Sequence, residues 1–506
     1  MRQALIFILL FSTQLLYAQL DKPVIGPEYN TAKKENFSGF LGESDIGLFT
    51  ADYVYYSKRK QELNIRQFHK TDLQLVSSNN IYSEIEDGYS NDPSEIFFQN
   101  NRFFLFSKLQ SDRDKTQLLA LEVFNSNCER INKVILDTIE TEEVSYIEEA
   151  QDKKGFILAK HLKYTQLIEQ EIALLKIDEE GNISWDKVIK SPMALKNLRI
   201  EKIAFKSNQT VYLLCNYAFD LGQGGSQQLN NQYALWAYNN KMQFLKEFEI
   251  RIKDKYINGV DIKINQDNHL LMSGYFNETK NPSIAGVFSL IIGDKLKVIH
   301  DSWNKYNADV MAKFFNKDDR NKDKELENYV FKDIQLLDDG SFFTIGEQYY
   351  KYIERNYDPR TNITTTTEHY NYNSIIVSYF TKEGEYKWTE RVSKSQNSTN
   401  DYGYFSSFVA LNSGKELYLF FNDSKKNNED PPENYFDYDN LFNNRRFQIS
   451  YAHINTKGIV NRTGLLDEDY DYMLRAKLSG QINPESMYLI TESNRSSKIV
   501  KVAVKN

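Results

Sequence analysis

The chain has 506 residues, a net charge of −8, 34 tyrosines, 32 phenylalanines and 2 cysteines. An apolar content of 41% is enough for a large buried core, which excludes a disordered polymer. Two cysteines exclude a disulfide-stapled scaffold and a cysteine-rich zinc module. A mildly acidic chain without a basic block argues against nucleic acid as a partner, and the aromatic excess favours strands over helices.

Residues 1–18 have the pattern of a cleaved signal peptide. Arg2 supplies the positive charge, residues 4–10 are an uninterrupted apolar run, and Ala18 is a small residue before the expected cut at Gln19. The alternative is a membrane anchor, but a span needs about 20 apolar residues, and polar residues break this run at positions 12–14. We therefore expect a periplasmic protein without a membrane span, with an extracellular location as the alternative.

The signal ends in Tyr17-Ala18-Gln19, and the rest of the chain is rich in Asn, Lys, Ile and Tyr. In both respects the sequence resembles envelope proteins of the Bacteroidota. Cys215 lies in an apolar run, where it is expected to behave as a small buried hydrophobe. Cys128 is far away in sequence and in a different repeat, so a bridge between the two cysteines is the less favoured alternative.

One pattern recurs eight times along the chain: a polar turn, then four or five apolar residues. The copies begin at Tyr53, Phe103, Phe156, Val211, Leu270, Phe342, Leu417 and Met487. A second apolar run follows each copy, and such short runs bounded by turn residues predict buried strands. The spacing fits four-stranded propeller blades of about 40–50 residues plus loops.

We therefore predict an all-β fold, namely a single β-propeller of eight blades, with seven blades as the alternative. Long loop insertions on one face and one short helix complete the prediction. The last repeat stops after its third strand, so residues 19–41 are expected to supply its outer strand and close the ring. The propeller itself is then expected to span residues 42–506.

One turn repeats closely in two copies. Gly181 is followed four residues later by Trp185, and Gly384 by Trp388, while Gly458 marks a weaker third copy. Glycine at this position supplies the positive φ that a tight hairpin requires. The turn resembles the degenerate blade repeat of PQQ-like and related β-propellers. The signatures of WD40 and sialidase blades are missing.

The later repeats contain four insertions, at residues 218–232, 301–327, 350–373 and 422–446. Loops between second and third strands and loops between blades emerge on the same face of a propeller, so this face is the predicted binding surface. Residues 301–316 are expected to form the short helix. Its apolar residues Val310, Met311, Phe314 and Phe315 fall on one side, which indicates packing onto the ring.

Two of these insertions are rich in aromatic residues among Asn, Thr and Arg. This composition is typical of recognition surfaces, because a rigid amphipathic ring provides contact area at low entropic cost. The alternative is that the rings pack against one another and hold the loops. The candidate binding residues are Tyr349, Tyr350, Tyr352, Tyr357, Tyr370, Tyr372, Tyr435, Phe436 and Tyr438.

The sequence contains no recognisable catalytic or metal-binding motif. The six histidines have no partner at zinc spacing, and the glycine-rich residues 222–226 lack the lysine of a phosphate-binding loop. The acidic residues 467–471 lack the glycine and glutamate of a calcium loop. We therefore predict no catalytic residues, metal or cofactor, and favour a protein that is not an enzyme.

Residues 487–505 resemble the last strands of a type IX secretion sorting domain, but the upstream part of that domain is missing. The leading hypothesis is a non-enzymatic periplasmic binding or scaffold protein that docks to another envelope protein through the inserted face. A soluble subunit of an outer-membrane translocon, such as that of type IX secretion, is its concrete form. The alternatives are a glycan-binding propeller and a lyase or glycosidase with a site in the central channel.

Overall fold

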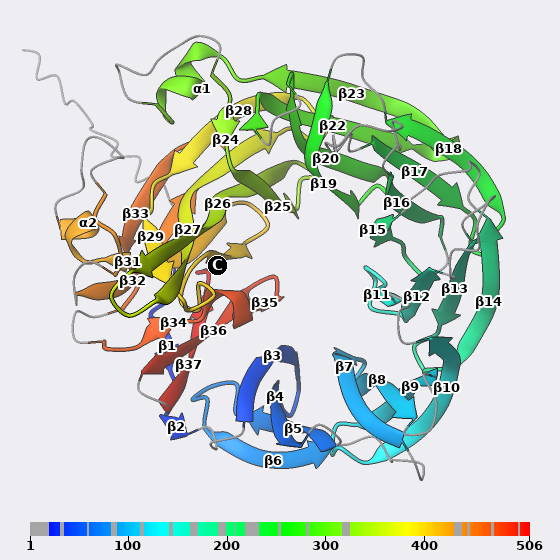
Figure 1. Ribbon diagram of the computed structural model, residues 1–506. Helices are drawn as coiled ribbons and strands as arrows, with labels where there is room; N and C mark the ends of the chain where they lie inside the picture. Colours follow the sequence, from blue (N-terminus) through cyan, green and yellow to red (C-terminus); the bar gives the residue numbers. More distant parts are fainter. Residues whose placement is uncertain are drawn as a thin grey trace, which may run out of the picture.

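Eight antiparallel sheets of four to six strands surround a central axis, and a ninth sheet has only two short strands (Figure 1). The first strand of each sheet lies near the axis and later strands lie progressively outward, which is the arrangement of an eight-bladed β-propeller. The computed structural model describes residues 20–30, 35–57, 60–81, 89–111, 116–140, 145–161, 171–190, 199–207, 209–217, 232–250, 255–279, 283–315, 324–429, 438–442, 446–466, 470–493 and 496–505.

Each of the first four blades is a four-stranded meander. Their strands are β3 (Glu35–Ser44), β4 (Gly47–Ser57), β5 (Lys60–Phe68) and β6 (Leu75–Ile81); β7 (Tyr89–Gln99), β8 (Arg102–Ser111), β9 (Thr116–Asn125) and β10 (Arg130–Glu140); β11 (Ser145–Glu149), β12 (Phe156–His161), β13 (Glu171–Ile177) and β14 (Ile183–Lys190); β15 (Arg199–Ala204), β16 (Val211–Tyr217), β17 (Gln232–Tyr238) and β18 (Phe244–Ile250).

Blades five to eight carry additional short elements. Their main strands are β19 (Tyr256–Ile264), β20 (Leu270–Asn277), β22 (Gly286–Gly293) and β23 (Lys297–Lys305); β25 (Tyr329–Leu336), β26 (Phe342–Asp358), β27 (Ile363–Phe380) and β28 (Tyr386–Val392); β30 (Phe408–Asn412), β31 (Leu417–Ser424), β32 (Phe447–Ile454) and β33 (Val460–Gly464); β34 (Met473–Leu474), β35 (Gly480–Asn483), β36 (Ser486–Ser493) and β37 (Ser496–Ala503). The additional elements are β21 (Ser283–Ile284), β24 (Leu326–Glu327), β29 (Gln396–Thr399), the helices α1 (Ala308–Ala312) and α2 (Lys426–Glu429), and the 3-10 turns Asp294–Leu296 and Ala476–Leu478.

The eightfold repeat seen in the sequence is confirmed. Every copy lies in the second strand of its blade, and the following apolar run forms the third strand. In β20 and β31 all eight residues are buried. Because the neighbouring blades cover both faces of a second strand, such a strand is buried along its whole length and begins with a continuous apolar run instead of an alternating pattern.

The apolar core consists of eight clusters, one between each pair of neighbouring blades. The cluster between the last blade and the first contains Tyr488 and Ile490 from β36 together with Leu48 and Phe68 from β4 and β5. The ring is therefore closed by the same kind of contact that joins its other blades.

The N-terminal strands complete the last blade. β1 (Val24–Ile25) and β2 (Tyr29–Asn30) both pair antiparallel with β37, and the Gly26 amide donates to the Ile499 carbonyl at 2.8 Å. The next strand, β3, already belongs to the first blade, which begins at Glu35 and not near residue 42. The first and the last of the described strands therefore belong to one sheet.

The repeated glycine turns join neighbouring blades. Gly181, Gly384 and Gly458 have φ values of 88°, 89° and 79°, as the hairpin requires. The Trp185 indole donates to the Asn240 carbonyl of the next blade at 3.1 Å, and the Trp388 indole donates to Thr456 at 2.9 Å. Each tryptophan thus links its own outer strand to the equivalent turn of the following blade.

Two sequence predictions about the insertions need correction. Residues 301–305 extend β23, and only Ala308–Ala312 form helix α1. Val310 of this helix and Phe314, which follows it, pack into the core between blades five and six. The tyrosine-rich residues 350–373 are not a loop but the extended ends of β26 and β27. A run of threonines and tyrosines suits an extended strand better than an irregular loop.

The structure also bears on the cysteines and on membrane-spanning helices, while several predicted segments lie outside the described residues. Both cysteines are free, and Cys215 is buried. No helix within the described ranges is long and apolar enough to cross a lipid bilayer. Residues 1–18, 222–226 and 467–469 lie outside the described residues. So do residues 218–231 of the first insertion, residues 316–323 of the second, and residues 430–437 and 443–445 of the insertion at 422–446.

Candidate binding surface

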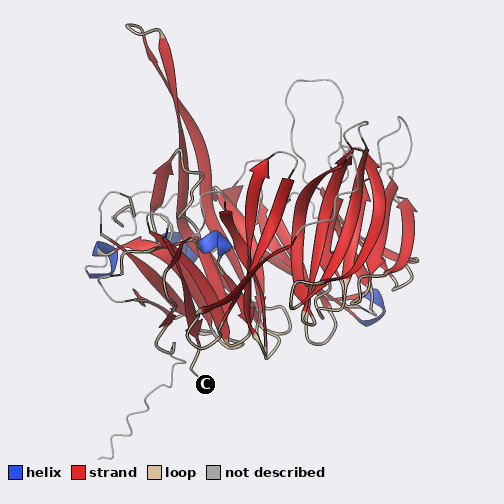
Figure 2. Ribbon diagram, turned by 90° about the horizontal axis from the view of Figure 1, so that it is seen from below, coloured by secondary structure: helices blue, strands red, loops and turns tan. Residues whose placement is uncertain are grey.

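A two-stranded arm extends from the sixth blade. β26 and β27 remain paired from Tyr349 opposite Tyr372 to Asp358 opposite Ile363, far past the end of β25. Figure 2 shows this hairpin rising well above one face of the ring. We call residues 350–371 the arm; they continue the second and third strands of the blade, so they lie on the face predicted for the insertions.

The outer part of the arm is exposed on both faces. Relative exposures are 50% for Tyr352, 49% for Ile353, 59% for Tyr357 and 56% for Ile363. Successive residues of a strand point to opposite faces, so Tyr352 and Tyr357 lie on different sides of the ribbon. An isolated two-stranded hairpin is at best marginally stable in water. A long exposed hairpin therefore adds little to the stability of the fold, which favours a role in binding.

One face of the arm carries a line of stacked rings. The Tyr352 ring stacks on His369 with centroids 4.3 Å apart, and Tyr350 lies 6.5 Å further along. The His369 Nε2 atom is 3.1 Å from a carboxylate oxygen of Glu354. These contacts hold the rings in fixed positions while leaving Tyr352 half exposed.

The predicted binding residues separate into groups. Tyr352 and Tyr357 are exposed and Tyr349 and Tyr350 partly buried, whereas Tyr370 and Tyr372 are buried at the base of the arm. Tyr372 packs on Tyr349 at 4.6 Å and Tyr370 on Tyr402 at 5.9 Å, so these rings support the arm. Tyr438 lies apart, under the Arg462 guanidinium, and Tyr435 and Phe436 lie outside the described residues.

A tight turn braces the base of the arm. β29 pairs with the edge of β27, from Gln396 opposite Tyr372 to Thr399 opposite His369. The chain then turns through Asn400, Tyr402 and Ser407, whose φ values are 53°, 58° and 81°. Residues other than glycine rarely adopt a positive φ, and those that do concentrate at functional sites. We call residues 400–407 the base turn.

A buried ion pair holds the base turn. The Lys394 Nζ atom is 2.8 Å from a Glu347 carboxylate oxygen, and neither side chain is exposed. Glu347 also accepts a hydrogen bond from the Ser407 hydroxyl, and Lys394 donates to the Tyr372 carbonyl. Burial lowers the pKa of Lys394, and the facing Glu347 carboxylate opposes this shift. The pair connects β26, β27 and the base turn in one network.

The last blade adds cations to this surface. The Arg475 guanidinium lies 3.3 Å from the centroid of the Tyr404 ring, and Lys477 donates to the Tyr372 hydroxyl at 3.0 Å. Tyr402 is 76% exposed beside them. The sequence analysis did not predict this part of the surface, although the run Tyr402-Gly403-Tyr404-Phe405 between two blades has the same aromatic-rich composition as the predicted binding residues. The arm and the base turn together form the arm surface.

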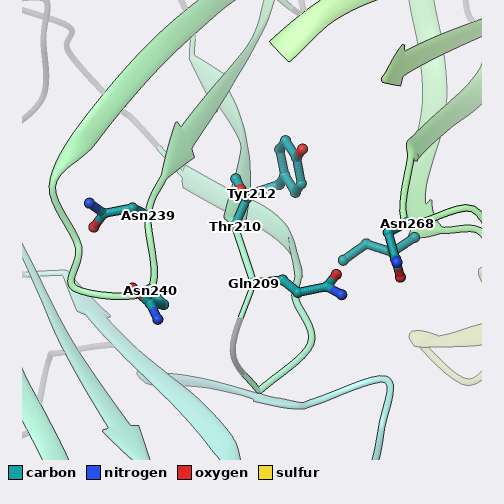
Figure 3. Close-up of a pocket in the computed structure, with 7 residues that line it drawn as sticks. Gln209, Thr210, Tyr212, Asn239, Asn240 and Asn268 are labelled. Carbon is teal, nitrogen blue, oxygen red and sulfur yellow. The ribbon is translucent and has the colours of Figure 1, made fainter. Parts of the chain in front are cut away.

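An open cavity of about 360 Å³ lies at the opposite end of the strands (Figure 3). Its lining residues are Gln209, Thr210, Tyr212, Asn239, Asn240, Ile264 and Asn268. The Asn239 side chain accepts from the amides of its own turn, and Asn268 accepts from Lys206 at 2.7 Å. The Asn239 side chain thus stabilises its own turn, and the Asn268 side chain stabilises a contact between the fourth and fifth blades. None of the lining side chains is a carboxylate, histidine or cysteine.

Charged side chains on the innermost strands of blades three to six form a second group, which we call the charged belt. Lys263 is 2.6 Å from Asp333 and Lys202 is 3.8 Å from Asp261, so cations and carboxylates of successive blades alternate. Burial raises the pKa of Glu148, to which the Tyr146 hydroxyl donates. The described residues contain no group of three or more histidine, cysteine, aspartate or glutamate side chains that could hold a metal ion.

Comparisons with known proteins find structural similarity to solved structures only. No protein family and no curated protein matches the chain. The WD40 domain of SCAP from fission yeast is similar with a TM-score of 0.40 and 8% identity, over 96% of this chain and 98% of that domain. The β-propeller domain of the Trilobed protease from Pyrococcus furiosus has a TM-score of 0.37 and 7% identity, over 87% and 100%. Prolyl oligopeptidase B from Galerina marginata is similar with a TM-score of 0.42 and 9% identity, over 93% of this chain and 55% of that enzyme.

Proposed function

We propose that this protein is a non-enzymatic binding or scaffold protein of the cell envelope that docks to another protein through the arm surface. The observation that carries the proposal is the arm itself, which projects from the ring with both faces exposed. A ring closed by eight apolar clusters does not need this hairpin for its stability. The signal-like residues 1–18 support export to the periplasm.

The composition of the arm surface suits a protein partner. Rigid tyrosines beside arginine and lysine are the residue types that dominate binding hot spots. Tyr352, Tyr357 and Tyr402 supply exposed rings, and the buried Lys394–Glu347 pair fixes the turn that carries Tyr402. Such preorganisation lowers the entropic cost of association.

The other two hypotheses gain less support. A glycan chain would stack on rings that share one face, but Tyr352 and Tyr357 lie on opposite sides of the arm. The charged belt on the inner strands pairs its carboxylates with lysines, so it resembles a structural network more than an acid–base site. A soluble translocon subunit is the form of the proposal that fits the predicted compartment.

Site-specific photo-crosslinking tests the proposal. A photoreactive residue replaces Tyr357 on the arm or, as the matched control, Leu245 on the outer strand β18, which is 45% exposed. Illumination of cells that naturally produce the protein should give a discrete protein adduct at Tyr357 and none at Leu245. Equal adducts at both positions, or none at either, would contradict docking through the arm.

A truncated arm provides the second variant. Residues 351–370 are replaced by Asn-Gly, which joins Tyr350 to Asn371, two residues that already face each other across the hairpin. The ring should keep its unfolding temperature, because the arm lies outside its apolar clusters. A partner recovered through Tyr357 should no longer bind the truncated protein.

A further inference from the structure

The two edges of the arm differ in chemistry. The outer part of β26 carries Lys351, Glu354, Arg355 and Asp358, and charges on an edge strand discourage pairing with other chains. Residues 363–367 of β27 read Ile-Thr-Thr-Thr-Thr, with no charge, proline or glycine. β-branched residues favour strands, so this edge has none of the usual protections against strand addition.

The hydrogen-bonding groups of this edge can be assigned from its base. The Asn400 amide donates to the Glu368 carbonyl at 2.9 Å, and the Glu368 amide donates to the Asn400 side chain at 2.8 Å. Both backbone groups of Glu368 therefore point away from β26. Antiparallel strands alternate in this respect, so the amides and carbonyls of Thr364 and Thr366 also point outward. On the opposite edge, the backbone amides and carbonyls of Ile353, Arg355 and Tyr357 point away from β27, because these residues face Glu368, Thr366 and Thr364 across the hairpin.

The chain itself shows what this edge accepts. β29, an extended uncharged segment, pairs antiparallel with β27 directly below the open part. The base turn then leads the chain away at Asn400, and no described strand continues the pairing along Thr364 and Thr366. An added strand would lie in line with β29, beside the exposed ring of Tyr402.

From these observations we infer that the β27 edge of the arm binds an extended, uncharged segment of the partner protein as an additional antiparallel strand. Thr364 and Thr366 provide the backbone hydrogen bonds, as in other cases of β-strand addition. The inference rests on the proposed docking function and specifies its chemistry. A second copy of this chain fits poorly, because two such short edges alone bury far less than the roughly 1,200 Å² of a stable interface.

A pair of proline variants tests the edge. Thr366→Pro removes an outward amide from the β27 edge, and Arg355→Pro removes one from the β26 edge directly opposite. Proline is tolerated where the missing amide faces solvent, so the arm should stay folded in both variants. Each substitution is combined with the photoreactive residue at Tyr357, and adduct yield is measured in the cells that naturally produce the protein.

We expect Thr366→Pro to lower the adduct yield by roughly tenfold, because it removes a hydrogen bond and obstructs the added strand. Arg355→Pro should leave the yield unchanged. The edge assignment is overturned if the adduct yield falls in Arg355→Pro alone, in both variants or in neither. In each of these cases an adduct with the unmodified arm still supports docking. An adduct with the mass of two copies of this chain overturns the heterologous partner. Absence of any adduct rejects the docking function itself.

Discussion

The ion pair between Lys394 and Glu347 is completely buried, with 2.8 Å between its charged atoms. Taking both charges out of water is expensive, so such a pair is poor evidence for stability by itself. The position of the pair at the base of the arm indicates a role in holding the arm in place. Lys394 follows β28, Glu347 lies where β26 leaves the ring, and both bond to the segments that brace the arm.

Replacing Lys394 by methionine should therefore be destabilising. The Glu347 carboxylate would stay buried and lose its nearer cation, with Lys332 remaining 3.4 Å away. We expect a loss of about 3 kcal/mol in the free energy of unfolding, because breaking a buried ion pair leaves the remaining charge poorly compensated. The shift of the urea unfolding midpoint measures it. The control Lys387→Met removes an exposed cation and should leave the midpoint unchanged; equal shifts would contradict a special role for the buried pair.

A second residue-scale prediction concerns pH. Burial raises the pKa of Glu148 above its ordinary value of 4.5. An acid whose pKa is higher in the folded state binds its proton more tightly there. Its contribution to stability is therefore present below about pH 4.5 and is lost as the pH rises through the raised value.

The variant Glu148→Gln does not ionise, so it should avoid this loss. We expect it to unfold at a higher urea concentration than the unchanged protein at pH 8, and at nearly the same concentration at pH 4. The amide oxygen of glutamine can still accept the Tyr146 hydroxyl bond. The nearby cations Lys202 and Lys263 act against burial and lower the pKa of Glu148. A lower urea midpoint for Glu148→Gln than for the unchanged protein at pH 8 would mean that these two lysines outweigh burial.

At the scale of single elements, the outer turn of the sixth blade combines two requirements. Gly384 has a φ of 89°, and a Cβ atom built there would lie 2.5 Å from the His300 ring of the fifth blade. Trp388, four residues later, donates to the seventh blade. One short hairpin therefore contacts both neighbours of its blade.

Gly384→Ala should lower the stability by about 1–3 kcal/mol, because alanine is strained at positive φ and no space is left beside His300. Urea unfolding at neutral pH measures the effect. The matched control is Gly480→Ala in β35, where a Cβ atom would meet no atom within 4 Å. A neutral Gly384→Ala would show that this turn is free to rearrange.

The elements also show what could be read from the sequence. The second strands were predictable, because burial between two blades produces short continuous apolar runs such as Leu270-Leu-Met. The arm was predicted as a loop, because a ribbon exposed on both faces has no apolar alternation to indicate a strand. The base turn was missed, since positive φ at Tyr402 and Ser407 depends on distant contacts with Lys477 and Glu347.

At the scale of the whole molecule, the ring is held by matched contacts at every interface. Eight apolar clusters join eight pairs of blades, and the N-terminal strands complete the blade formed by the C-terminal ones. The outer strand of each blade keeps one unpaired edge at the rim of the ring, whereas the arm carries its open edge away from the ring. Strand addition to the arm would therefore involve a segment that the ring does not need.

The closure itself can be tested with a disulfide. Ile25 faces Val500 across β1 and β37, so Ile25→Cys with Val500→Cys should form a bridge between the two ends of the chain. Closing so long a loop should stabilise the protein by about 2–4 kcal/mol, which a reductant should abolish. The native thiols should not interfere, because Cys215 is buried and burial raises the pKa of Cys128 to about 11. Val24→Cys with Val500→Cys should not bridge, since neighbouring residues of a strand point to opposite faces. Bridging by both pairs would indicate a loosely attached N-terminal strand.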